Sequence, residues 1–355
     1  PIMCVPAEFY TNLGTSGLKI SRIIVGCMSF GKKYWADWVI EDKEKVFAIL
    51  KECYDKGLRT FDTADMYSNG YSEVLLKEFM EKYGIKRNRV VILTKLYFPI
   101  DEDGNEEDPV ITSTNRSKAP LEDYVNSQGL SRKHIMDAAQ ASIERLGTYA
   151  DVIQIHRFDS STPMEETMEA LHDIVKLGYC RYIGASTMKT YQFVMMQGIA
   201  EKHGWTKFIS MQNYFNLLYR EEEGEMMEYC KLTNVGVIPW SPNARGVLTR
   251  PYGSAGETTR NKAESSRMKT LGLDVLGESD QEIVRRVEEI ATKHDTSMAA
   301  GSTAYVLYKG CSPIVGFSKP ERVAAAVEAF PLHKKLSPEE VAYLEAAYTA
   351  KPWPS

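Results

Sequence analysis

The feature that most constrains the fold of this 355-residue chain is a unit that recurs along it: an amphipathic helix, a glycine, and a short apolar run that stops at a polar residue. In one example, residues 44–54 carry apolar side chains at helical spacing, Gly57 can end that helix, and residues 60–64 form the run. Eight such runs occur, at residues 23–30, 60–64, 90–95, 151–156, 182–186, 209–214, 236–241 and 313–317. Because strands that alternate with helices pair in parallel, the pattern predicts an α/β fold, a closed (β/α)8 TIM barrel. An open doubly wound sheet is the alternative.

We expect one barrel domain over residues 1–355, with additions to the repeating unit. Residues 9–21 contain two glycines between short extended pieces, which predicts an N-terminal β-hairpin over one end of the barrel. Residues 101–128 and 243–278 lack the repeat and predict long loops at the C-terminal face, where such loops shape substrate sites unless they are disordered. Residues 331–355 form a C-terminal segment.

Composition argues against several classes of function. The net charge is −5 and basic residues occur only in short runs, so we expect no nucleic-acid binding. No stretch approaches the roughly 20 apolar residues of a membrane span, and the first residues lack the pattern of a secretory signal. The six cysteines are scattered, and no Cys/His cluster has metal spacing. These features predict a cytoplasmic protein that binds neither a membrane nor a metal.

One nucleotide-binding motif is present only in part. Residues 26–32 spell G-x-x-x-x-G-K after a predicted strand, but Lys33 stands where a P-loop carries Ser or Thr, so the magnesium ligand is missing. The chain also lacks G-x-G-x-x-G. Nucleotide hydrolysis and a Rossmann domain are therefore not expected.

The polar residues that end the predicted strands are candidates for catalysis, because active sites of (β/α)8 barrels lie at the carboxyl ends of the strands. Asp62, Lys95 and His156 end the second, third and fourth runs, and Tyr67 lies in the loop after the second. An ammonium lowers the pKa of a neighbouring phenol, so Lys95 can make Tyr67 a better proton donor. Asp62 can supply the counter-charge that a buried lysine requires, and His156 can orient a carbonyl oxygen. Each residue alone has a structural explanation, but the four complementary types together indicate a catalytic site.

The segments around these positions resemble the motifs of the aldo-keto reductases, in order and over nearly the whole chain. The matching segments are residues 61–67, 70–73, 93–95 and 154–156. Within that family the chain is similar to fungal versiconal hemiacetal acetate reductase-like members. The resemblance implies metal-independent reduction of an aldehyde or ketone, with Tyr67 as general acid, Lys95 and Asp62 tuning it, and His156 orienting the carbonyl.

The same resemblance implies NADPH as cofactor. Ser186 and Gln212 match positions that hold the nicotinamide carboxamide, and Trp240 matches an aromatic residue that stacks on the nicotinamide ring. Thr187 departs from the family, in which many members have Asn. The segment after Trp240 resembles the loop that wraps the pyrophosphate, through Ser241, Pro242, Asn243 and Arg245.

The segment after the last predicted strand combines a hydroxyl and two cations with the start of a helix, which makes an anion site. It resembles the family's 2′-phosphate site, with Ser318, Lys319 and Arg322 as ligands, and it favours NADP(H) over NAD(H). Ala325 and Ala326 stand where relatives often carry Glu and Asn toward the adenine.

Two other functions remain open at this stage. An NADPH-binding barrel similar to the potassium-channel β-subunits could act as a redox-sensing auxiliary subunit, since those relatives can retain the same four residues. A phosphate-handling barrel could instead use residues 318–322 for its substrate. The expected partner is a small-molecule carbonyl substrate. The sequence determines neither its identity, nor the direction of reaction in the cell, nor the oligomeric state.

Overall fold

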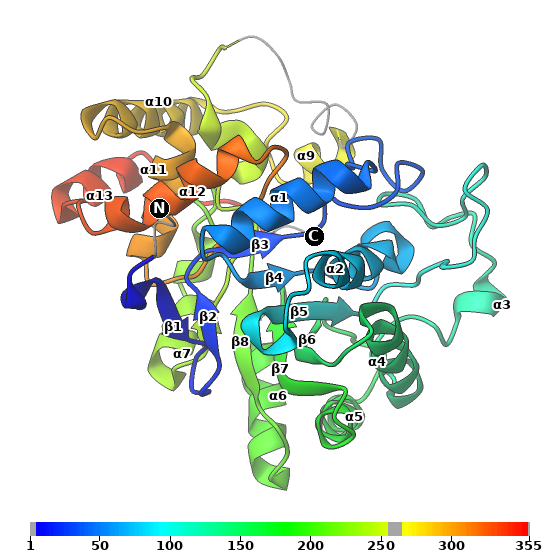
Figure 1. Cartoon of the computed structure of the whole chain (residues 1–355). Helices are drawn as coiled ribbons and strands as arrows, with labels where there is room; N and C mark the ends of the chain where they lie inside the picture. Colours follow the sequence, from blue (N-terminus) through cyan, green and yellow to red (C-terminus); the bar gives the residue numbers. More distant parts are fainter. Residues whose placement is uncertain (1–4, 255–264, 354–355) are drawn as a thin grey trace.

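The computed structural model describes residues 5–254 and 265–353, and it shows a parallel barrel surrounded by helices (Figure 1). The eight strands pair in the order β10-β3-β4-β5-β6-β7-β8-β9, all in parallel. Their bounds are β3 Ile24–Gly26, β4 Thr60–Asp62, β5 Val91–Leu96, β6 Ala150–Ile155, β7 Cys180–Ser186, β8 Phe208–Gln212, β9 Gly236–Val237 and β10 Ile314–Gly316. The predicted (β/α)8 fold is confirmed, since strands β3 to β9 pair in chain order and the last strand, β10, pairs with the first, β3.

The barrel closes between β9 and β10. The backbone N–H of Ser312 donates to the carbonyl of Val237, and that of Ile314 donates to the carbonyl of Pro239, both at 2.9 Å. A parallel bridge between Trp240 and Ile314 continues the contact. Since this closure leaves no free edge, the open doubly wound alternative is wrong.

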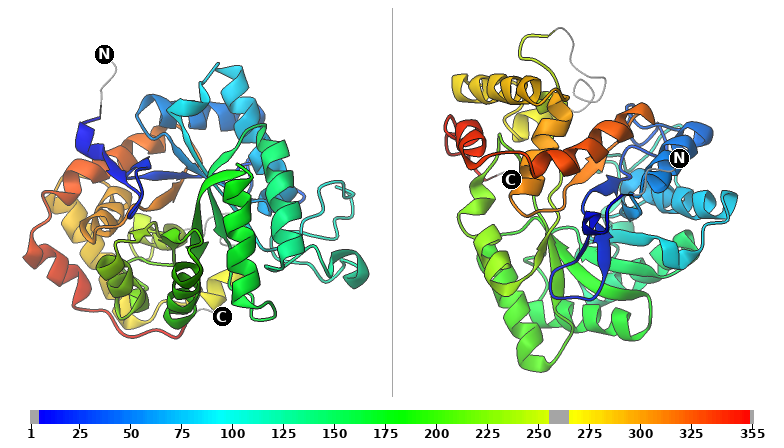
Figure 2. Two further views of the ribbon diagram at one scale, coloured as in Figure 1. Left: turned by 90° about the horizontal axis from the view of Figure 1, so that it is seen from below. Right: turned by 60° about the vertical axis from the view of Figure 1, so that its left-hand side comes forward.

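Helices surround the strands, as the two views in Figure 2 show. On α1, for example, Asp42 caps the first turn through its side chain, while Val46, Leu50 and Cys53 are buried on one stripe. The α-helices are α1 Lys43–Asp55, α2 Tyr71–Lys82, α3 Leu121–Tyr124, α4 Arg132–Leu146, α5 Met164–Lys176, α6 Thr190–His203, α7 Met226–Thr233, α9 Ser265–Thr270, α10 Glu278–Lys293, α11 Met298–Tyr308, α12 Glu321–His333 and α13 Pro338–Glu345. Short 3₁₀ helices are η1 Ala7–Phe9, η2 Tyr67–Gly70, η3 Arg87–Arg89, η4 Glu221–Glu223 and η5 Ala244–Thr249. Among the described helices, none is both long and apolar enough to cross a lipid bilayer.

The predicted N-terminal hairpin is present and covers the end of the barrel at which the strands begin. Strands β1 Tyr10–Asn12 and β2 Lys19–Ser21 pair in antiparallel fashion. Leu13 and Ile20 from the hairpin join a buried cluster with Ile24, which begins β3. The catalytic candidates therefore lie at the opposite, open end.

The two predicted long loops differ in structure. Residues 101–128 contain only the one-turn helix α3 and are otherwise irregular. Residues 243–278 contain η5 and α9, so this segment is partly helical, and residues 255–264 fall outside the described part of the chain. The C-terminal segment 331–355 begins inside α12, which includes Pro331, and contains α13.

Candidate active site

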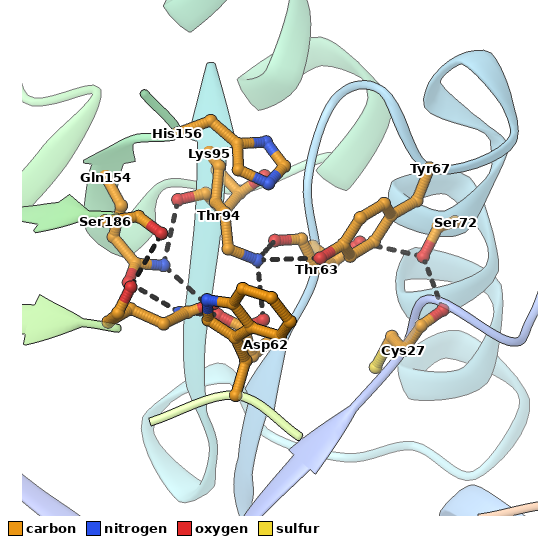
Figure 3. A network of polar contacts seen from close by, with 12 residues as sticks. Cys27, Asp62, Thr63, Tyr67, Ser72, Thr94, Lys95, Gln154, His156 and Ser186 are labelled. Carbon is orange, nitrogen blue, oxygen red and sulfur yellow. Dashed lines mark hydrogen bonds and ion pairs between the residues drawn. The ribbon is translucent and has the colours of Figure 1, made fainter. Parts of the chain in front are cut away.

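The four side chains singled out at the strand ends meet at the carboxyl end of the barrel (Figure 3). Lys95 Nζ donates hydrogen bonds to Asp62 Oδ2 at 2.6 Å, to the carbonyl of Thr63 at 2.9 Å and to the hydroxyl of Tyr67 at 3.1 Å. Lys95 has an exposed fraction of 0% and Asp62 of 2%, so this ion pair is shielded from solvent. The ring centroids of Tyr67 and His156 lie 6.1 Å apart, nearly edge-on.

Parallel strand register explains how these residues come together. Asp62 ends β4 and pairs with Leu93 of β5, two residues before Lys95. Lys95 in turn pairs with Gln154 of β6. His156 directly follows β6, where its N–H donates to the carbonyl of Leu96. Because the carboxyl ends of parallel strands share one edge, side chains that end adjacent strands share one site.

Tyr67 is placed by a strained loop. The two residues after it, Ser68 and Asn69, adopt left-handed backbone conformations with φ of 50° and 51°. The Asn69 side chain donates to the carbonyl of Ile111 and accepts from the N–H of Asp101, both in the long loop after β5. Backbone strain of this kind persists only where surrounding contacts enforce it, and here those contacts fix the tyrosine.

The electrostatics of the site keep Lys95 charged. Burial alone would lower the pKa of Lys95, but the carboxylate of Asp62 and the hydroxyl of Tyr67 outweigh that effect, and the pKa lies above its ordinary value. Lys95 is therefore an ammonium at neutral pH, directed at the Tyr67 hydroxyl.

His156 is kept neutral. Burial, reinforced by the nearby charges of Lys95 and Arg157, holds the pKa of His156 well below its ordinary value. Its Nδ1 is buried and has no hydrogen-bond partner among the described residues. A neutral imidazole with an unused ring nitrogen can donate to or accept from a bound ligand, depending on its tautomer.

A network of amides holds Asp62 from the side opposite the lysine. Asp62 Oδ1 accepts from Gln154 Nε2 at 3.1 Å and from Gln212 Nε2 at 2.9 Å, and Gln212 Nε2 also lies 2.9 Å from Gln154 Oε1. Ser186 Oγ donates to the backbone carbonyl of Gln212 at 2.8 Å. The amide oxygen of Gln212 accepts no hydrogen bond from the described residues, so it stays available to a ligand.

Gln154 belongs to the site, although the sequence did not single it out as a functional residue. It lies at the centre of an apolar strand and is fully buried. A single amide within an apolar run was the signal, since a buried polar side chain needs a partner. The structure shows that this partner is the carboxylate that pairs with Lys95.

Trp240 is fixed at the rim by two contacts. Its Nε1 donates to Thr187 Oγ1 at 3.0 Å, and its ring stacks on Tyr214 with centroids 4.5 Å apart and planes at 26°. The Arg267 guanidinium lies 5.6 Å from the centroid of the indole. Thr187, at the position where the chain departs from many relatives, thus orients the aromatic ring, a role the sequence did not indicate.

The loop after Trp240 makes tight turns. Ser241, Ala244 and Arg245 have φ of 54°, 46° and 55°. Backbone hydrogen bonds close these turns, from the N–H of Ala244 to the carbonyl of Ser241 and from that of Gly246 to the carbonyl of Asn243. The Asn243 side chain is already used, since its Oδ1 accepts from Ser302 and Thr303 of α11. Asn243 therefore anchors the loop, and Pro242 beside it is buried.

The predicted 2′-phosphate residues lie together at the start of α12, after β10. Ser318, Lys319 and Arg322 are exposed, and none of their side chains forms a hydrogen bond or ion pair with the described residues. Two uncommitted cations and a hydroxyl at a helix N-terminus fit an anionic group.

The fold is that of an aldo-keto reductase, and residues 22–349 match the Aldo/keto reductase family, to which the chain belongs. A Schizosaccharomyces pombe protein that carries the name aryl-alcohol dehydrogenase is 53% identical, with 97% of each chain covered. A Saccharomyces cerevisiae protein of the same name is 52% identical over 95% of this chain and 96% of its own. Versiconal hemiacetal acetate reductase of Aspergillus parasiticus is 48% identical over 96% of this chain and 97% of its own.

Membership of this family establishes the class of reaction. The chain is an NAD(P)-dependent oxidoreductase, and its reductase relatives support reduction of small-molecule carbonyl compounds. The similarity to versiconal hemiacetal acetate reductase expected from the sequence is confirmed.

Proposed function

We propose that the protein reduces an aldehyde or ketone to an alcohol with NADPH, and that Tyr67 donates the proton. The observation that carries this proposal is the buried ammonium of Lys95, 3.1 Å from the Tyr67 hydroxyl and 2.6 Å from Asp62 Oδ2. The cofactor supplies a hydride to the carbonyl carbon. The Tyr67 proton passes to the carbonyl oxygen, so the alcohol gains both hydrogens and NADP⁺ remains.

The remaining residues of the site assist the transfer of the proton from Tyr67. A phenolate forms at Tyr67 as the proton leaves, and the Lys95 ammonium stabilises it. Asp62 and the carbonyl of Thr63 hold the ammonium in place. Neutral His156 donates a hydrogen bond to the carbonyl oxygen and thereby orients the substrate for attack.

The cofactor's nicotinamide end fits the residues around the amide network. The free amide oxygen of Gln212 and the hydroxyl of Ser186 would hold the carboxamide, and Trp240 would offer its ring to the nicotinamide. The pyrophosphate would lie against the loop 241–246, beside the guanidinium of Arg245.

The preference for NADPH over NADH rests on the start of α12. Lys319 and Arg322 carry charges that no described carboxylate neutralises, and Ser318 adds a hydroxyl. A 2′-phosphate would supply the missing negative charge, which NADH lacks.

The first test is the rate of NADPH oxidation with benzaldehydes, comparing wild type with Tyr67→Phe. We expect kcat to fall by a factor of about 10² to 10⁴, as for loss of a general acid. Tyr83→Phe, which alters a tyrosine at the end of α2 that is 36% exposed, is the control and should keep wild-type rates. Full activity in Tyr67→Phe would contradict the assigned acid.

The second test addresses the cofactor. Wild type should show a lower kcat/KM with NADH than with NADPH, and Arg322→Ala should reduce that difference roughly tenfold by weakening NADPH alone. Equal use of both cofactors would contradict the 2′-phosphate site. Tight NADPH binding without turnover of any carbonyl compound would instead favour a cofactor-binding auxiliary subunit.

A further inference from the structure

Two arginines converge on the aromatic wall beside His156. Arg116 lies in the long loop after β5, and Arg157 directly follows His156 along the chain. Their guanidinium carbons lie 4.7 and 5.7 Å from the centroid of the Phe98 ring. That ring in turn meets the His156 imidazole edge-on, with centroids 5.1 Å apart. Both cations therefore lie at the same side of the site as the imidazole.

A third arginine, Arg267 of α9, approaches the same region from the opposite rim. Its guanidinium lies beside the indole of Trp240, and its charge contributes to the lowered pKa of His156. Burial and then the repulsion from Arg267 lower the pKa of Arg157, to about 10, and that of Arg116. Three cations from separate segments thus lie against aromatic rings of the site, two on Phe98 and one beside Trp240.

These three half-buried arginines lack the carboxylate partners that Arg145, a buried arginine, has in this protein. Within residues 5–254 and 265–353, none of the three forms an ion pair, and the Nε atoms of Arg116 and Arg267 are buried without a hydrogen-bond partner. Among the described residues, the guanidinium of Arg157 donates one hydrogen bond, to the backbone carbonyl of His156 at 2.6 Å. Arg145, by contrast, pairs with Glu73 and Glu102.

Withdrawing a cation even partly from water without a counter-charge is costly, so three such arginines near His156 and Trp240 indicate a ligand that carries the negative charge. Planar guanidinium groups bind carboxylates with two parallel hydrogen bonds. The cofactor phosphates have candidate sites of their own, in the loop 241–246 and at Ser318, Lys319 and Arg322. Arg116 and Arg157 lie on Phe98, next to His156, which is the side of the site where the proposed function puts the carbonyl compound.

We propose that Arg116, Arg157 and Arg267 form an anion subsite that selects carbonyl substrates bearing a carboxylate, held beside the aromatic wall of Phe98. This inference rests on the proposed function, since it names the class of substrate for the same site. It defines a substrate with two features, a reducible carbonyl directed at Tyr67 and an acidic group directed at the arginines.

The test compares two aldehydes of the same shape, 4-formylbenzoate and its methyl ester, with NADPH. We expect wild type to prefer the carboxylate by about tenfold or more in kcat/KM, the range of charge-assisted hydrogen bonds. Arg116→Gln, Arg157→Gln and Arg267→Gln should each reduce that ratio severalfold. Arg285→Gln, which alters an exposed arginine of α10 that pairs with Glu282, should leave the ratio unchanged.

A binding measurement separates failure of the subsite from failure of the proposed reaction. Quenching of tryptophan fluorescence by terephthalate should saturate at lower concentration than quenching by its dimethyl ester, and the three arginine variants should remove that difference. If neither aldehyde is reduced but this preference holds, the subsite stands and the proposed reaction fails. Equal use of both aldehydes, or arginine variants that weaken NADPH binding while the carboxylate preference persists, would overturn the subsite.

Discussion

At the scale of single residues, buried charges survive where the fold gives them a partner. Lys95 is fully buried beside Asp62, and the ammonium keeps its proton because the carboxylate compensates for lost hydration. Glu222 is the contrasting case. It is buried in η4, and its hydrogen bond from Asn213 only partly offsets burial, which raises the pKa of Glu222 to about 7.

Because the pKa of Glu222 is raised, the stability of the folded protein depends on pH. The folded state holds the Glu222 proton more tightly than the unfolded chain, whose ordinary value is 4.5, so stability falls as pH rises from about 4.5 through about 7. Glu222→Gln should remove that loss, which is on the order of 3 kcal/mol at pH 8. The unfolding free energy of wild type and variant should differ at pH 8 and converge near pH 5. A variant less stable than wild type at pH 8 would show that the carboxylate is stabilising.

At the scale of elements, the hairpin β1–β2 and the catalytic loop η2 lie at opposite ends of the barrel, so stability and catalysis can be separated. The hairpin turn fits against the strands through Gly14, whose φ is 58°. A Cβ at this position would lie 2.4 Å from the carbonyl oxygen of Ile209 and 2.7 Å from the N of Gly236. No side chain fits there without displacing backbone.

Gly84 provides a matched control for this contact. It has the same φ of 58°, and an added Cβ would meet nothing within 4 Å. Gly84→Ala should cost about 1 kcal/mol through backbone strain alone. Gly14→Ala should cost at least about 2 kcal/mol more by urea unfolding, with kcat unchanged, because it also displaces the hairpin. If the two variants lose the same free energy of unfolding, displacing the hairpin costs no free energy.

At the scale of the whole molecule, one buried ion pair connects segments that the barrel alone does not. Arg145 of α4 pairs with Glu73 of α2 at 2.7 Å and with Glu102 of the long loop at 2.8 Å. Thr94 of β5 donates to the other oxygen of Glu73. The ion pair of Arg145 and Glu73 therefore connects two helices, a strand and the long loop after β5.

Arg145→Met should destabilise the protein by about 3 to 5 kcal/mol, since it leaves Glu73 buried and uncompensated. In the double variant Glu73→Gln with Arg145→Met, the buried charge is gone, and the total loss should be smaller than the sum of the single losses. Thermal and urea unfolding of the four proteins measure this coupling. Additive losses would mean that the two side chains act independently.

The sequence by itself determined the fold and the four residues at its centre. Apolar runs that alternate with amphipathic helices leave a chain few ways to bury both faces of its strands, and the closed barrel is one of them. Asp62, Lys95 and His156 were recognisable because each lies within one residue of the end of a strand, and the ends of parallel strands meet wherever the barrel forms. Strand lengths were overestimated, as in β9, where only Gly236–Val237 is a regular strand before the chain bends into the rim.

Only the tertiary structure decided which other side chains surround the four catalytic candidates. The amides of Gln154 and Gln212 meet at Asp62, and Thr187 meets Trp240, through strand register and loop paths that no local pattern encodes. The arginine subsite joins residues 116, 157 and 267, which share no periodicity. Periodicity records which face of an element is buried, whereas contacts between distant loops depend on how the closed barrel brings the ends of its strands together.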